Sequence, residues 1–176
     1  VITGSENLKP CTYTESRGSA QCKSTVIFAG MRTEGTTIIK AKKSRNHTEL
    51  LCKYLKLPIK IQKKKNFDLI QIDQVKKIKK LLYNIPGDIS SSAFFIVLTV
   101  LNKDSSLVIK NININSSRIG IITILKKMGA NIYLKNVKNY KGEKNADIHI
   151  SYTNSLKAIN CPTKLNSSAI DEFLVI

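Results

Sequence analysis

The chain has 176 residues, of which 42% are hydrophobic and 23% are charged, and its formal net charge is +17 at pH 7. This length and apolar content suit one globular domain or parts of two, and they exclude a chain that is disordered throughout. The longest apolar runs, such as residues 93–101, fall short of the ~20 residues that a transmembrane helix needs, so we expect no membrane partner. Because the chain starts at Val1 and ends at Ile176 within a predicted helix, we interpret it as an internal fragment.

The type and distribution of the basic residues are not those of a nucleic-acid-binding surface. Of the 29 basic residues, 25 are lysines, and they are spread along the whole chain. The densest runs, residues 63–65 and 76–80, contain no interleaved aromatic residue on which a base would stack. We therefore interpret these runs as solvated faces and expect no nucleic-acid partner.

The cysteines and histidines show no metal-ligand spacing. The four cysteines form no C-x-x-C pair, and the two histidines lie far apart in the sequence. The residues concerned are Cys11, Cys22, Cys52, Cys161, His47 and His149. This pattern predicts free thiols in a reducing, cytoplasmic compartment and no metal.

An internal repeat organises the predicted elements. The first copy reads as a helix at residues 19–31, a strand at 36–41, a helix at 44–57 and strands at 59–62 and 68–73. The second copy repeats this order, with a helix at 91–101, a strand at 107–112, a helix at 116–128 and strands at 131–137 and 147–152. A third copy is predicted to open with a helix from residue 167. The repeat predicts an α/β fold of tandem units, with helices covering sheets.

A boundary between the copies is predicted near Gly87. Residues 74–83 are basic and amphipathic, and residues 85–88 (IPGD) form a turn signal that interrupts them. We therefore divide the chain into residues 1–86 and 87–176, and we expect a hinge where the two parts meet.

Three polar clusters open apolar helical segments. They are residues 19–24 (SAQCKS), 44–49 (SRNHTE) and 170–173 (IDEF). The backbone N–H groups and the positive dipole end of a helix N-terminus favour an anion. The clusters therefore indicate a phosphorylated or carboxylated ligand.

These clusters also carry a family resemblance. Together with residues 86–95 (PGDISSSAFF), 117–122 (SRIGII) and 128–130 (MGA), they follow the order found in 5-enolpyruvylshikimate-3-phosphate synthases, and the chain resembles the middle ~40% of such an enzyme. The resemblance implies two lobes of three β-α-β-α-β-β units each, with helices packed on mixed four-stranded sheets. Residues 1–86 would then be the later part of the first lobe, and residues 87–176 the first part of the second.

The activity that this resemblance implies is transfer of the carboxyvinyl group of phosphoenolpyruvate to the 5-hydroxyl of shikimate 3-phosphate, in the pathway to chorismate and the aromatic amino acids. No cofactor is implied, and a monomer is expected for the full-length enzyme. Two alternatives stay open: an enolpyruvyl transferase acting on UDP-N-acetylglucosamine, and a non-catalytic basic α/β repeat protein that binds nucleic acid.

The resemblance assigns roles to five residues. Ser19, Ala20, Gln21 and Arg45 match positions that bind shikimate 3-phosphate, and Asp171 matches the substrate-binding aspartate that accepts the hydroxyl proton. Each residue also has a plainer interpretation when taken alone: Ser19 caps a helix, Arg45 is a surface charge, and Asp171 is an acidic residue in a first helical turn.

Two further residues in the clusters each have two possible roles. Lys23 either adds positive potential or faces water, and Ser44 either contacts the phosphate or caps a helix.

The sequence departs from the family pattern at Ile89, in residues 115–118 (NSSR) and at Leu174, and these changes predict looser loops with an intact fold. The family's remaining substrate-binding cations lie outside residues 1–176. We therefore predict that this chain alone is inactive.

Overall fold

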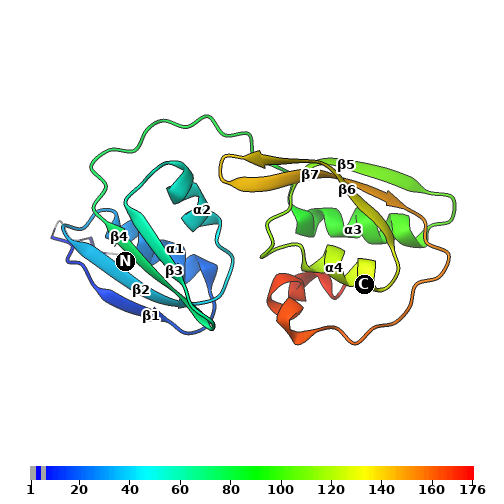
Figure 1. Ribbon diagram of the computed structural model, residues 1–176, viewed down its shortest axis with the longest axis horizontal. Coiled ribbons are helices and arrows are strands. Elements are labelled where there is room, and N and C mark those ends of the chain that lie inside the picture. The colour runs from blue at the N-terminus through cyan, green and yellow to red at the C-terminus, as the bar shows by residue number, and fades with distance from the viewer. Residues whose placement is uncertain (1–2, 5–6) are drawn as a thin grey trace. The chain divides into compact units, whose positions relative to one another are not determined.

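The computed structural model describes residues 3–4 and 7–176 and divides the chain into two compact units, Val1–Leu82 and Tyr83–Ile176. Each unit holds helices and a sheet with a hydrophobic core of its own (Figure 1). The α/β fold class predicted from the repeat is confirmed, because both units follow the order helix, strand, helix, strand, strand.

The first unit contains a mixed four-stranded sheet, as predicted. Its order is β1 (Thr12–Glu15), β2 (Thr36–Lys42), β4 (Phe67–Asp73) and β3 (Ile59–Lys63). The β1–β2 pair is parallel and is joined through helix α1 (Ala20–Gly30), whereas the β2–β4 and β3–β4 pairs are antiparallel. Helix α2 (His47–Tyr54) connects β2 to β3.

The core of the first unit forms where both helices meet one face of this sheet. The alternating pattern of β2 and β4 turns a set of apolar side chains toward the helices. The buried members of this core are Ile27, Met31, Ile39, Ala41, Cys52, Ile70 and Ile72. The ends of α1 and α2 are thereby fixed relative to the sheet.

The second unit contains a sheet with three strands among the described residues. Its order is β5 (Ser106–Asn113), β7 (Glu143–Ser151) and β6 (Asn131–Tyr140), and both pairs are antiparallel. A parallel bridge between Gly87 and Ile112 stands beside β5, where β1 stands beside β2 in the first unit. The prediction of four strands is therefore corrected here, because residues 85–88 make one bridge and then turn into a helix.

Two helices and two short 3-10 helices complete the second unit. Helices α3 (Ile89–Leu101) and α4 (Gly120–Lys127) bury apolar side chains against one face of the sheet. The 3-10 helices are η1 (Thr163–Ser168) and η2 (Ile170–Glu172). The predicted continuous helix from residue 167 is wrong, because Ala169 has φ −149° and ψ 5° and separates the two 3-10 segments.

Two predicted helices begin later than expected. Helix α2 starts at His47 and not at residue 44, and helix α4 starts at Gly120 and not at residue 116. Before α4, the side-chain oxygen of Asn115 accepts hydrogen bonds from the backbone N–H and the hydroxyl of Ser117, at 2.9 and 2.8 Å. This local turn competes with a first helical turn and delays the helix.

Candidate functional site

The start of α1 is held in place by a capping serine and a buried carboxylate. The Ser19 hydroxyl accepts a hydrogen bond from the Cys22 N–H at 3.2 Å, so the predicted N-cap is confirmed. Ahead of it, the Glu15 carboxylate accepts from the N–H groups of Arg17 and Gly18 at 2.9 and 2.8 Å, and Gly18 takes a positive φ of +80°. Ala20 and Gln21 therefore lie in a first turn whose N–H groups have no acceptor within the helix.

The start of α2 is joined to α1 by a side-chain hydrogen bond. The hydroxyls of Ser24 and Thr48 lie 2.7 Å apart, from one helix to the other. Asn46 occupies the N-cap position of α2, so of the two interpretations of Ser44 the helix cap is wrong and the phosphate contact stays a prediction. The Ser44 hydroxyl is buried and has no hydrogen-bond partner in the described part of the chain.

A pocket of about 220 Å³ lies between the two helix starts. Its lining residues are Ala20, Gln21, Ser24, Arg45, His47 and Thr48. The structure thus brings together three of the residues predicted to bind substrate, Ala20, Gln21 and Arg45, and Ser19 caps the same helix start. None of the lining residues is acidic, and a guanidinium, an amide and hydroxyls converge there, which suits an anion with several acceptor oxygens.

Ser24, His47 and Thr48 are pocket residues that the sequence reasoning did not single out. All three lie inside the two polar clusters at residues 19–24 and 44–49. The missing information was the pairing of the two helix starts, which depends on contacts between distant parts of the sequence.

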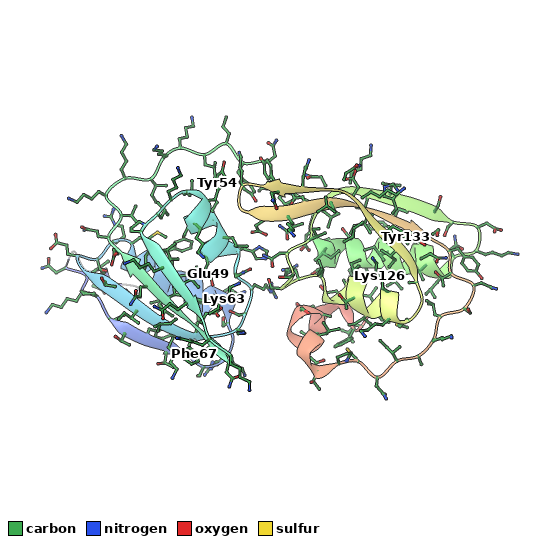
Figure 2. The ribbon with its side chains drawn as sticks, viewed as in Figure 1. Glu49, Tyr54, Lys63, Phe67, Lys126 and Tyr133 are labelled. Carbon is green, nitrogen blue, oxygen red and sulfur yellow. The ribbon has the colours of Figure 1, made fainter. Side chains whose placement is uncertain are left out.

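Lys23 and Glu49 form a buried ion pair next to this pocket. The Lys23 ammonium lies 2.6 Å from Glu49 Oε1, and the two side chains are 1% and 4% exposed. The same ammonium donates a hydrogen bond to the backbone carbonyl of Arg45 at 2.8 Å. Both interpretations of Lys23 are therefore corrected: it does not face water, and its charge is balanced by Glu49. Figure 2 labels Glu49 among the side chains of the first unit.

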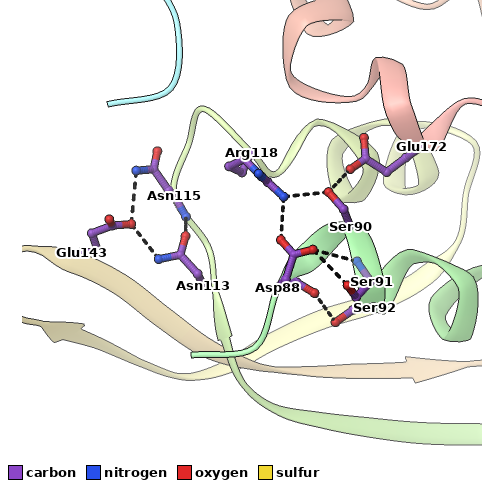
Figure 3. A network of polar contacts seen from close by, with 9 residues as sticks. All are labelled: Asp88, Ser90, Ser91, Ser92, Asn113, Asn115, Arg118, Glu143 and Glu172. Carbon is purple, nitrogen blue, oxygen red and sulfur yellow. Dashed lines mark hydrogen bonds and ion pairs between the residues drawn. The ribbon is translucent and has the colours of Figure 1, made fainter. Parts of the chain in front are cut away.

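In the second unit, Asp171 lies exposed in η2, next to a residue that takes part in a network of polar contacts. The neighbouring Glu172 is 5% exposed, and its Oε1 accepts a hydrogen bond from the Ser90 hydroxyl. Arg118 Nη2 donates to that same hydroxyl at 2.7 Å and pairs with Asp88 Oδ1 at 2.5 Å (Figure 3). The η2 turn is therefore tied through Glu172 to the N-terminus of α3.

Asp88 is the acid that caps α3. Its side chain accepts from the Ser91 N–H at 3.0 Å. Partial burial alone would favour the protonated acid, but the Ser91 N–H and the Arg118 guanidinium outweigh it and hold the pKa of Asp88 below its ordinary value. The ionised form of Asp88 is thus the one that the folded network favours.

A second group of polar contacts orders the turn that carries Arg118. Glu143 Oε2 accepts from the amides of Asn113 and Asn115 at 2.6 and 3.3 Å, and the Asn115 N–H donates to the side-chain oxygen of Asn113 at 2.9 Å (Figure 3). The predicted loosening of residues 115–118 has no counterpart in this set of contacts, because each asparagine is held by at least two hydrogen bonds.

The described residues form neither a metal-binding cluster nor a membrane-spanning helix. Within residues 3–4 and 7–176, no group of three or more histidine, cysteine or acidic side chains is arranged to hold a metal. Among the helices of this same part of the chain, none has the length and apolar character needed to span a bilayer. Burial, followed by the negative charge of Glu49, raises the pKa of the Cys52 thiol to about 11, which leaves it protonated at neutral pH.

Comparison with known proteins decides the family. A family model described as EPSP synthase (3-phosphoshikimate 1-carboxyvinyltransferase) matches residues 1–174. The chain belongs to the EPSP synthase family. The predicted family resemblance is thereby confirmed.

Individual members of this family match over the whole chain. The 3-phosphoshikimate 1-carboxyvinyltransferase of Legionella pneumophila (strain Lens) is 43% identical over 177 residues, covering 100% of this chain and 40% of the relative. That of Caldicellulosiruptor bescii is 40% identical over 178 residues, covering 99% and 40%. The chain thus spans about 40% of the length of these EPSP synthases.

Solved structures agree with this assignment. EPSP synthase from Acinetobacter baumannii matches with a TM-score of 0.85 and 35% identity, covering 98% of this chain and 38% of that one. The enolpyruvyl transferase NikO from Streptomyces tendae matches with a TM-score of 0.60 at 15% identity, which shows a shared fold.

Proposed function

We propose that this chain is a working part of a 3-phosphoshikimate 1-carboxyvinyltransferase. The whole protein would transfer the carboxyvinyl group of phosphoenolpyruvate to the 5-hydroxyl of shikimate 3-phosphate and release inorganic phosphate. The observation that carries the proposal is the pocket in which Gln21 and Arg45, taken from two separate motifs of the family, line one space. Membership of the EPSP synthase family supplies the chemistry that this pocket would serve.

In this proposal, the first unit binds the phosphorylated substrate. Ser19, Ala20 and Gln21 would present a hydroxyl, backbone N–H groups and an amide, and Arg45 would add the charge-assisted hydrogen bonds that its planar guanidinium makes with phosphate oxygens. The absence of a carboxylate among the pocket-lining residues supports an anionic ligand.

Asp171 is proposed as the proton acceptor. A hydroxyl is a poor nucleophile, so a carboxylate that takes its proton while the oxygen bonds to the enolpyruvyl carbon lowers the barrier. The exposure of Asp171, next to a Glu172 that is buried and hydrogen-bonded, supports this division of roles.

We further propose that Val1–Leu82 and Tyr83–Ile176 belong to the two lobes of the enzyme, which would act as a cytoplasmic monomer.

A chimera tests the function directly. In the Legionella pneumophila relative, the aligned segment is replaced by this chain, and phosphate release is measured with shikimate 3-phosphate and phosphoenolpyruvate. We expect turnover, and we expect Asp171→Asn to lower kcat by a factor on the order of 10²–10⁴ while folding is retained.

The controls separate the alternatives. UDP-N-acetylglucosamine in place of shikimate 3-phosphate should give no turnover by the chimera. A folded chimera that is inactive with shikimate 3-phosphate would contradict the proposal, as would an Asp171→Asn variant with unchanged kcat. Binding of DNA that falls steeply with salt and is indifferent to shikimate 3-phosphate would instead favour the nucleic-acid alternative.

A further inference from the structure

Lys23 is a charged residue that the proposed substrate contacts leave unexplained. It lies in α1, and its side chain is 1% exposed. Lysine is almost never buried to this extent unless its charge is paired, and here Glu49 Oε1 lies at 2.6 Å. Burying both charges is costly even when they pair, so a purely stabilising role does not account for them well.

The Lys23 ammonium contacts protein groups, and it is with these groups that its role is argued. Lys23 is not among the residues that line the pocket of about 220 Å³. Its ammonium donates instead to the Arg45 carbonyl at 2.8 Å and lies against Glu49. Whatever Lys23 does for the pocket is therefore transmitted through these two partners.

The contact to Arg45 fixes the backbone that carries the guanidinium. Arg45 precedes the N-cap of α2, in a segment without regular secondary structure between β2 and α2. A hydrogen bond to its carbonyl ties this segment to α1, which presents Ala20 and Gln21 to the same pocket. The Ser24–Thr48 bond ties α1 also to the first turn of α2, which follows this segment.

We propose that Lys23 is a positioning residue, whose buried ammonium, held by Glu49, anchors the Arg45 backbone and so sets the guanidinium against the α1 side of the phosphate pocket. This inference deepens the proposed function and rests on it. Glu49 serves to compensate the lysine charge, so that the ammonium can be buried and directed at a backbone carbonyl. If the backbone of Arg45 were not held in place, the ligand would have to order it, and the cost of this ordering would reduce the binding free energy.

The decisive variant removes both charges together. Lys23→Met alone would leave Glu49 as an unpaired buried carboxylate, so a loss of binding could reflect a loss of fold. The double variant Lys23→Met/Glu49→Met replaces the ion pair with apolar side chains of similar size, a change that often preserves stability, and leaves the net charge unchanged. It removes the anchor on Arg45 and leaves the pocket-lining residues in place.

The experiment titrates inorganic phosphate into the full 176-residue chain, with affinity followed by NMR and folding by thermal melting. We expect the double variant to melt near the wild-type temperature and to bind phosphate more weakly, by a factor on the order of ten. Lys53→Met, on the exposed side of α2, is the matched lysine control and should behave like the wild type.

Arg45→Ala separates this inference from the proposed site. If Arg45→Ala leaves phosphate affinity unchanged, the proposed site itself is wrong. If Arg45→Ala weakens binding and the folded double variant does not, the pocket stands and the positioning role of Lys23 is overturned. Positioning also requires that the double variant add no further loss in the Arg45→Ala background, because its effect passes through Arg45.

A measurement on the wild type covers the case in which the double variant does not fold. Phosphate should shift the Arg45 Nε resonance more than the Lys23 Nζ resonance, because Arg45 lines the pocket and Lys23 does not. A larger shift at Lys23 Nζ would make it a ligand-contacting residue and would overturn the proposal.

Discussion

Gly120 determines how closely α4 approaches the segment that leads to Asp171. A β-carbon built at this position would lie 2.7 Å from the Ser168 carbonyl oxygen and 2.8 Å from the Ala169 β-carbon. Both distances are shorter than a real side chain tolerates, and one partner is backbone, which moves only if the whole segment moves. A glycine is therefore required here by the close approach of two backbones.

We predict that Gly120→Ala displaces the turn that carries Asp171 while the rest of the second unit stays folded. The expected cost is about 1–3 kcal/mol in the free energy of unfolding, which is typical of overpacking and exceeds the gain of up to ~1 kcal/mol from better helix propensity. Denaturant unfolding and amide chemical shifts of residues 163–176 measure both effects. Unchanged shifts in that segment would show that η1 does not rest on α4 as the structure has it.

At this scale, the sequence predicted the residues whose roles depend on local structure. Ser19 was identified as a helix cap from its neighbours alone, and Gln21 and Arg45, which the family resemblance assigned to one substrate, line one pocket. Lys23 was wrongly interpreted, because its environment comes from residues of a different element. Nothing in residues 19–24 indicates that the lysine is buried and forms an ion pair with Glu49.

Helix α3 is the element whose start depends most on one titrating side chain. Asp88 caps it through the Ser91 N–H and also pairs with Arg118, which contacts the Ser90 hydroxyl that holds Glu172. Since folding lowers the pKa of Asp88, its contribution to stability is present above its unfolded pKa and is lost as the pH falls through the folded value.

We predict that Asp88→Ala destabilises the second unit by roughly 0.5–2 kcal/mol at pH 7, the usual cost of losing a cap. The difference between the variant and the wild type should shrink as the pH is lowered below the unfolded pKa of about 4, because the wild type then loses the same carboxylate. Urea unfolding at pH 7 and pH 3 makes the comparison. A difference that stays constant over this range would mean that the ionised carboxylate is not the stabilising form.

The order of the elements was predictable, but several of their ends were not. Periodicity and β-branched runs located the strands of both repeats. Strand β1 was missed because it has only four residues and shows no alternation of apolar and polar side chains. The predicted starts of α2 and α4 are too early, and before α4 the Asn115–Ser117 turn competes with the first helical turn. The 3-10 segments near the C-terminus reflect one backbone conformation at Ala169 that no local pattern signals.

At the scale of the whole molecule, the repeat and the family motifs together predicted the architecture, since both units share one element order. The second sheet differs from the first because the segment before α3 makes a bridge at Gly87 in place of a strand. The chain spans about 40% of the length of its relatives, and the reaction proposed above is that of the whole protein. What the chain itself should retain is the ability of its first unit to recognise the phosphorylated substrate.

That ability is tested most directly by titrating shikimate 3-phosphate into the isotope-labelled 176-residue chain and following every assigned resonance. Our account predicts saturable shifts concentrated at residues 19–21, 24, 45, 47 and 48, which surround the pocket, with no matching response to UDP-N-acetylglucosamine. Saturable shifts that gather instead on the lysine run at residues 76–80, or a folded chain whose pocket resonances do not respond, would contradict it.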